Sequence, residues 1–186
     1  MSANLIETVR KNMGYGPIQK VDPVEQEVKN VDAATTRERL GQSAIPVVMA
    51  VLYKFTRSEK GRNAIISGTK NGTWLDTILE EKERAAVDKV AQYAGVSRDE
   101  AGRTMENVAE ETIRVVKESA GNKLTQESLK TLIGDQRHSI LVHLPAALQM
   151  GSLLEDDTLD DRTNKMEGPM SNLMHSIENK FSGGGA

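Results

Sequence analysis

The chain has 186 residues, a net charge of −3 and no cysteine. A chain without cysteine has no disulfides, thiolate nucleophiles or cysteine-bound metal sites, and its slightly acidic balance provides no overall field to attract a phosphate backbone. Aromatic residues make up only 3%, so the core must be built from aliphatic residues and methionine, which favours helices over strands.

The first 34 residues predict a short helix followed by a linker. Four apolar side chains recur at helical spacing: Leu5, Ile6, Val9 and Met13. Gly14 and Gly16 then stop the helix. From residue 15 to residue 34, two prolines, mixed charge and weak periodicity indicate a linker. We therefore expect a tethered N-terminal helix and a globular domain that begins at residue 35.

The first long helix of that domain is predicted from its start signal. Thr35 and Glu38 have the spacing of a capping box, in which each side chain pairs with a free backbone N–H group. An apolar stripe follows, from Leu40 onward. Pro46 is expected to kink this helix, or to restart it with Ser43 as a new cap, because proline lacks an N–H group.

The later helices follow the same logic of a polar cap and a closing glycine. Helices are expected to begin after Ser58, Thr73, Ser97, Thr125 and Asp135. Glycines are expected to close helices at Gly68, Gly95 and Gly134. The most apolar helix, residues 136–150, is expected to continue through Pro145. No segment has a convincing strand pattern.

These elements predict an all-α, compact multi-helical domain at residues 35–154 with amphipathic helices tethered at both ends. Residues 155–168 form an acidic linker, and residues 169–186 form a final helix with a glycine-rich end. Five apolar side chains recur at helical spacing in that last helix: Met170, Leu173, Met174, Ile177 and Phe181. This stripe predicts docking to a protein partner, to a second copy, or to the domain itself.

The stretch "VAQYAGVSRDEAGR", which begins at Val90, resembles the helix-turn-helix of a bacterial repressor. In such a motif the second helix enters the major groove of DNA. A DNA-binding regulator is therefore the alternative function, with a corner at residues 86–105 and with Ser97, Arg98 and Arg103 facing DNA. Residues 84–121 carry six basic against seven acidic side chains, which opposes DNA binding. A tight helix–helix corner explains the same glycine and serine.

Other chemistries lack support from the sequence. The basic concentration between Lys54 and Lys70 has no phosphate-binding glycine loop, so solvation of a surface explains it best. His138 and His143 are five residues apart and point in different directions on a helix. We expect no catalytic residue, no cofactor and no metal. The only conceivable general bases are three acids that a solvated helix face explains better: Glu106, Glu110 and Glu111.

Three ordered segments resemble the YidB-like bacterial family, whose function is uncharacterised. An apolar, proline-containing helix is followed by Ser-x-x-Gly, here Ser58 and Gly61. A Gly-aliphatic-Ser turn follows at residues 95–97. A leucine-rich stretch then leads through Gln136 into Leu-Pro-Ala at residues 144–146. The resemblance covers residues 40–154, implies an all-helical fold, and carries over no catalytic residue.

We therefore predict a non-enzymatic, cytoplasmic bacterial protein that serves as a protein–protein interaction or scaffold module. Its expected partner is another protein or a second copy, bound through the C-terminal helix. Nucleic acid is not the expected partner, because the chain has no basic footprint. We expect no membrane span, since nowhere do 18 apolar residues run together.

Overall fold

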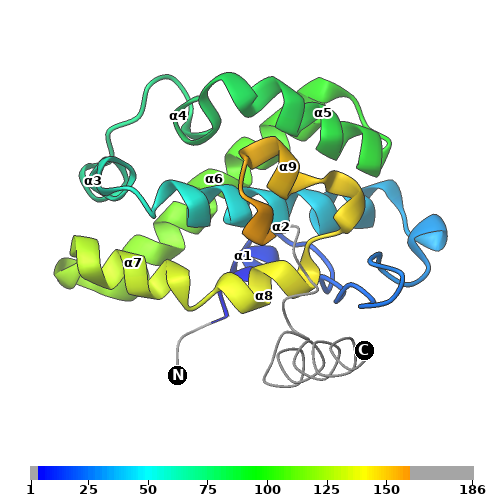
Figure 1. The fold of residues 1–186 in the computed structure, drawn as a ribbon, viewed down its shortest axis with the longest axis horizontal. Helices are drawn as coiled ribbons and strands as arrows, with labels where there is room; N and C mark the ends of the chain where they lie inside the picture. Colours follow the sequence, from blue (N-terminus) through cyan, green and yellow to red (C-terminus); the bar gives the residue numbers. More distant parts are fainter. Residues whose placement is uncertain (1–3, 160–186) are drawn as a thin grey trace, which may run out of the picture.

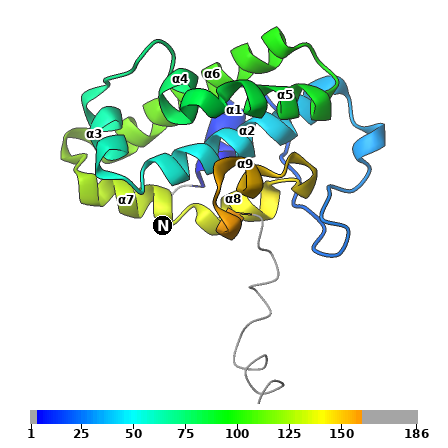
Figure 2. The same cartoon turned by 45° about the horizontal axis from the view of Figure 1, so that its top comes forward.

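A central helix organises residues 4–159, the part of the chain that the structure, a computed structural model, describes. Helix α2 (Thr36–Phe55) buries every residue from Leu40 to Leu52. A helix that is apolar all round belongs in the middle of a bundle, and the figures show α2 with other helices around it (Figures 1 and 2). The predicted all-α fold is confirmed, with no strand among residues 4–159.

The other helices surround α2 in chain order. Their bounds are α1 (Leu5–Asn12), α3 (Glu59–Ser67), α4 (Trp74–Leu79), α5 (Glu83–Ala94), α6 (Arg98–Ala120), α7 (Gln126–Gly134), α8 (Arg137–His143) and α9 (Met150–Leu154). In Figure 1, α4 and α5 lie above α2, and α7 and α8 lie below it. Helices α1, α5, α6 and α8 all contact α2 directly. One hydrophobic cluster joins them, so the described residues share a single core.

The restart of the helix at Pro46, one of the two expected outcomes, does not occur. The capping box of Thr35 forms as predicted, and α2 then continues through Pro46 as one helix. Ser43 does not cap a new helix; its hydroxyl donates to the backbone carbonyls of Arg39 and Leu40 instead. Packing on every side of α2 keeps this proline inside a helix that propensity alone would interrupt.

The N-terminal segment corrects the predicted domain boundary at residue 35. Leu5, Ile6 and Val9 are at most 4% exposed and belong to the common core. The backbone N–H group of Leu5 donates to Oε1 of buried Gln136 at 3.0 Å. Helix α1 is therefore part of the globular domain and not a tethered helix, because its apolar face is covered by α2 and α6.

Residues 15–34, predicted to be a linker, form a strap across the same domain. Gln42 of α2 holds the strap with both ends of its amide: Oε1 accepts the Gln19 N–H group at 2.8 Å, and Nε2 donates to the Gln19 carbonyl at 3.0 Å. Further on, the N–H group of Val21 donates to the carbonyl of Val142 at 2.8 Å. The backbone of this segment is thus fixed by hydrogen bonds to a side chain and to a distant backbone carbonyl, which no local pattern predicts.

The expected continuous helix at residues 136–150 is interrupted. Helix α8 ends at His143, Leu144 is extended, and a short 3₁₀ turn at Ala146–Leu148 precedes α9. Steric conflict between a proline ring and the preceding residue disfavours helix at that residue, so Pro145 acts as the break. His143 is buried next to it, with Nδ1 2.6 Å from the Ser139 carbonyl.

The predicted acidic linker begins in a docked conformation. Asp156 is 8% exposed and Leu159 is 1% exposed, and Leu159 belongs to the common core. Among the described residues, Val24 is the one exposed large hydrophobic side chain. The core is therefore closed at Leu159. The rest of the linker, and the helix predicted at residues 169–186, lie outside the described residues.

Candidate functional site

The predicted corner between α5 and α6 forms as expected. Gly95 closes α5 in a left-handed conformation with φ of 72°, and Ser97 caps α6 by accepting the Glu100 N–H group at 3.2 Å. Nε of Arg98 donates to Asp88 at 2.5 Å, which ties the start of α6 to α5. Two of the three side chains proposed to face DNA therefore hold the corner together.

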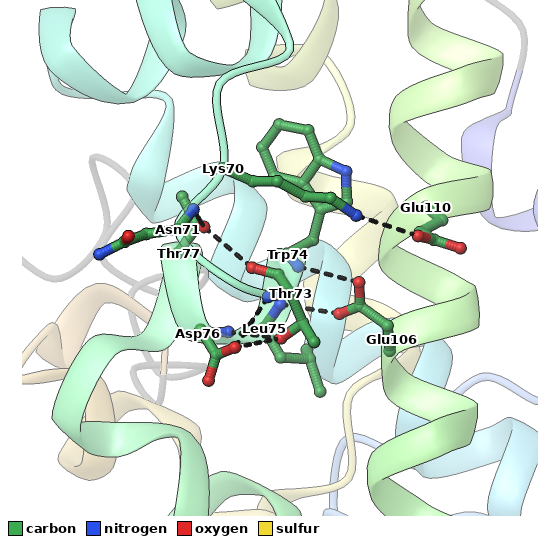
Figure 3. Close-up of polar contacts among 9 residues, drawn as sticks. All are labelled: Lys70, Asn71, Thr73, Trp74, Leu75, Asp76, Thr77, Glu106 and Glu110. Atoms are coloured by element: carbon green, nitrogen blue, oxygen red, sulfur yellow. Dashed lines mark hydrogen bonds and ion pairs between the residues drawn. The ribbon is translucent and has the colours of Figure 1, made fainter.

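A carboxylate from α6 holds the N-terminus of α4 (Figure 3). Glu106 accepts the backbone N–H group of Trp74 at 2.9 Å and that of Leu75 at 2.8 Å, one on each oxygen. The first N–H groups of a helix have no partner inside the helix, and the helix dipole favours a negative charge there. Glu106 thus acts as a cap supplied by a distant segment, and it fixes α4 against α6.

The two following acids on α6 also bind other segments. Glu110 forms an ion pair with Lys70 at 3.3 Å (Figure 3). Glu111 accepts Nδ2 of Asn12 in α1 at 2.7 Å and also pairs with Arg114. The three acids considered as general bases are therefore engaged in contacts with other segments. The expected solvated face holds for exposed Glu110 and is wrong for Glu106 and Glu111, which are half-buried.

The loop before α4 completes this network. Oδ2 of Asp76 accepts both the N–H group and the hydroxyl of Thr73 at 2.8 Å, and Thr73 returns a capping contact to the Asp76 N–H group. These bonds to the charged carboxylate, led by the backbone bond from Thr73, lower the pKa of Asp76. Lys70 lies over the ring of Trp74, 6.0 Å from its centroid (Figure 3).

A cleft of about 320 Å³ opens beside this network, between α4, α5 and α6. Its lining residues are Thr73, Leu75, Glu83, Gly102, Arg103, Glu106 and Asn107. Burial, then a hydrogen bond with Asp76 and the charges of Asp76 and Glu106, raise the pKa of Glu83. A carboxyl with a raised pKa in a cleft is a feature that reactive sites share with structural clusters of acids. Arg103, the third residue of the DNA alternative, is exposed at this cleft.

The raised pKa of Glu83 predicts a stabilising substitution. A carboxyl whose pKa is higher in the folded state costs stability when ionised, and this cost disappears as the pH falls through that pKa. Glu83→Gln removes the charge and keeps a donor for Asp76. We expect the free energy of unfolding at pH 7 to rise by roughly 0.5 kcal/mol, and the gain to vanish at acidic pH.

Urea unfolding at a series of pH values measures this difference. Glu81→Gln, which removes an equal charge from an exposed neighbour, is the matched control and should leave the free energy of unfolding unchanged. A Glu83→Gln protein that is less stable than the wild type at pH 7 would show that the charged carboxylate is favourable in the fold.

The basic concentration between Lys54 and Lys70 is largely neutralised within the fold. Arg57 pairs with Asp156 at 2.8 Å, and Lys70 pairs with Glu110. Arg62 donates to the backbone carbonyls of Thr56 and Arg57 at the C-terminal end of α2. Cations suit that end of a helix because carbonyl groups are left unpaired there. These contacts favour the interpretation of the cluster as a folded surface over a phosphate site.

Residues 4–159 form neither a metal site nor a ligand-sized pocket under the strap. No group of three or more histidine, aspartate or glutamate side chains in that range is arranged to hold a metal ion. The cavity under the strap, between Tyr15 and Tyr93, has a volume of about 50 Å³, well below the roughly 300 Å³ of a typical ligand pocket. Over the same residues, no helix is both long and apolar enough to cross a membrane.

The predicted partner-binding stripe, Met170, Leu173, Met174, Ile177 and Phe181, lies outside the described residues. Among the described residues, Ser97 and Arg98 lie together at the α5–α6 corner, and the three acids lie along α6. Sequence reasoning missed Glu106 as a cap because its partners lie about thirty positions away. The one sequence signal for this role is that Glu106 lies next to buried positions of an amphipathic helix.

The chain was also compared with known proteins. No protein-family model, no curated protein and no solved structure matches it.

Proposed function

We propose that this chain is a protein–protein interaction or scaffold module without catalytic activity, and that its contact surface is the apolar stripe of residues 169–186. One observation carries the proposal: nearly all the large hydrophobic side chains of the described residues are already covered. Leu154 and Leu159 are 4% and 1% exposed, and among residues 4–159 only Val24 is a large hydrophobic side chain left exposed. The sequence beyond residue 159 adds five further apolar residues at helical spacing.

The free energy of burying apolar side chains shows how strongly such a stripe could bind. Burying one large aliphatic side chain is worth about 1.5–3 kcal/mol, so five of them on one helical face form a strong docking element. An amphipathic helix with this spacing fits a hydrophobic groove on a partner. Methionine suits such a contact because its flexible thioether adapts to irregular surfaces.

We also propose that the chain is a distant relative of the YidB-like bacterial family and works in the cytoplasm. The motif residues behind that resemblance have structural roles that support it. The Ser58 hydroxyl accepts the Gly61 N–H group at 2.9 Å, and the turn at residues 95–97 forms the α5–α6 corner. The absence of cysteine is compatible with a reducing compartment.

A pair of charge-matched variants tests the stripe. Leu173→Asp with Ile177→Asp places two charges on the apolar face, and Asn172→Asp with Asn179→Asp places the same charges on the opposite face of the helix. Full-length protein is immobilised, and captured proteins from a bacterial lysate are quantified by mass spectrometry. Sedimentation velocity measures self-association in parallel. We expect the apolar-face variant to lose affinity by about tenfold or more, and the control to retain it.

Equal capture by both variants would contradict the proposal, because binding would then not depend on the stripe. So would a wild-type chain that neither captures a protein reproducibly nor self-associates. The circular dichroism of each variant is compared with that of the wild type, so that lost capture can be told from lost folding.

A further inference from the structure

Three clefts border helix α4 and the residues at its ends. Their volumes are about 330, 320 and 280 Å³, and Leu79, Leu75 and Thr77 respectively belong to their linings. The four large apolar side chains of α4 are nevertheless buried, at 8% exposure or less. Helix α4 is thus held by its apolar face, with open space beside it.

Glu80, at the C-terminal end of α4, has a backbone conformation that favours glycine. Its φ is 52° and its ψ is −128°, a combination that costs free energy for a residue with a Cβ atom. Helix α6 ends in nearly the same conformation, with φ of 53° and ψ of −141°, and the residue there is Gly121. The Glu80 side chain compensates little, because it is 64% exposed and its ion pair with Lys60 spans 4.0 Å. Such strain persists only where the surrounding packing imposes it.

The attachment of α4 at its two ends would let it move as a unit. Gly72, with φ of 78°, precedes the helix, and Glu80 follows it. The carboxylate of Glu106 holds the first N–H groups of α4 from outside the segment. Helices α2, α5 and α6 contact one another directly, so they do not depend on α4 to stay together.

We propose that α4 is an opening segment: residues 73–79 leave the core as one unit while the rest of the bundle stays folded. Release of the backbone strain at Glu80 favours the open state, and the hydrogen bonds of Glu106 oppose it. Local unfolding of this kind occurs in segments with few buried contacts. In the closed fold, Val24 is the one exposed large hydrophobic side chain among residues 4–159. Opening therefore gives the protein an apolar surface that the closed fold hides.

Amide hydrogen exchange of the full-length protein, followed by NMR, tests this opening. The amides of Ile78 and Leu79 in α4 are compared with those of Val48 and Leu52 in α2, at urea concentrations below the unfolding transition. We expect the α4 amides to share one protection factor, at least about tenfold smaller than that of the α2 amides, which falls as urea increases.

Two results of this experiment would overturn the proposal. Equal protection in α4 and α2 would mean that α4 opens only when the whole domain unfolds. Protection factors that differ along α4 and do not respond to urea would indicate fraying of single turns instead of one opening unit.

A substitution in another helix separates local opening from global unfolding. Val9 of α1 is fully buried, and Val9→Ala leaves a cavity that destabilises the whole fold. We expect this variant to speed exchange of the α2 amides and to leave exchange of the α4 amides unchanged. Equal acceleration in both helices would contradict an opening that is confined to α4.

A pair of glycine substitutions tests the role of the strain. Glu80→Gly removes the strain of the closed state and should slow exchange of the α4 amides several-fold. Glu81→Gly removes the same charge from an exposed neighbour whose φ is not positive. This control should leave exchange unchanged or make it faster, because glycine adds only flexibility there. Faster exchange in Glu80→Gly than in the wild type would show that strain at Glu80 does not favour opening.

Discussion

Replacing Gly61 with alanine is expected to destabilise the protein by about 3 kcal/mol or more. Gly61 is buried in the first turn of α3, directly after the corner that follows α2. A Cβ atom at this position would overlap the Phe55 carbonyl oxygen and lie 2.9 Å from Oγ of Ser58. The obstacle is backbone at the end of the central helix, so it cannot rotate away as a side chain would.

The same overlap gives the Ser-x-x-Gly motif a physical reason. The Ser58 hydroxyl donates to the Phe55 carbonyl at 3.0 Å and accepts the Gly61 N–H group at 2.9 Å. Two backbone groups therefore converge on one hydroxyl, and only glycine leaves room for them. A methyl group at Gly61 would force α3 away from α2 and break these contacts.

Gly134→Ala is the matched control for this prediction. Gly134 ends α7, and a Cβ atom there would have no neighbour within 4 Å. Alanine is the better helix former, so this change should be neutral or stabilising by roughly 0.5 kcal/mol. Urea unfolding followed by circular dichroism measures both variants. A Gly61→Ala protein as stable as Gly134→Ala would show that the α2–α3 corner relaxes at little cost.

Most helix starts in this protein could be predicted, because the signal is local; the expected cap Asp135 is wrong, since α8 begins at Arg137 without a side-chain cap. Thr35, Ser58, Thr73 and Thr125 cap the expected helices, and Gly95 with Ser97 makes the expected corner. A cap acts within three or four residues, so the sequence contains the whole interaction. The all-α class followed from the same evidence.

Contacts between distant segments could not be predicted. The strap depends on Gln42, whose amide binds residue 19 and also donates to the His143 carbonyl at 3.0 Å. Pro46 and Pro145 look alike in sequence, yet α2 continues through one and α8 stops before the other. Helix α2 is buried on all sides, whereas the segment after α8 turns toward α9. Tertiary packing decided between them.

The acids of α6 show the same limit at the candidate site. Glu106, Glu110 and Glu111 looked equivalent as a solvated face. In the structure Glu106 binds two backbone N–H groups, whereas Glu110 forms an exposed ion pair with Lys70. Such a difference depends on where α4 lies relative to α6, which no local pattern determines.

Replacing Glu106 with alanine should consequently cost far more than replacing Glu110. Glu106→Ala leaves the N–H groups of Trp74 and Leu75 without partners beside an apolar core. Hydrogen bonds to a charged group contribute about 1.5–3 kcal/mol each, and the six-residue α4 is too short to hold itself. We expect a loss of about 3 kcal/mol, with detachment of α4.

The single tryptophan makes this measurable, because Trp74 begins α4 and is 7% exposed. Its fluorescence should shift to longer wavelength in Glu106→Ala at urea concentrations below the main unfolding transition. Glu110→Ala removes only a surface ion pair and should cost less than about 1 kcal/mol. Glu106→Gln, which keeps one acceptor oxygen, should fall between the two. Equal stability and equal emission for the two alanine variants would contradict this prediction. The apolar side chains of α4 would then hold the helix, and water would replace the Glu106 carboxylate without loss of stability.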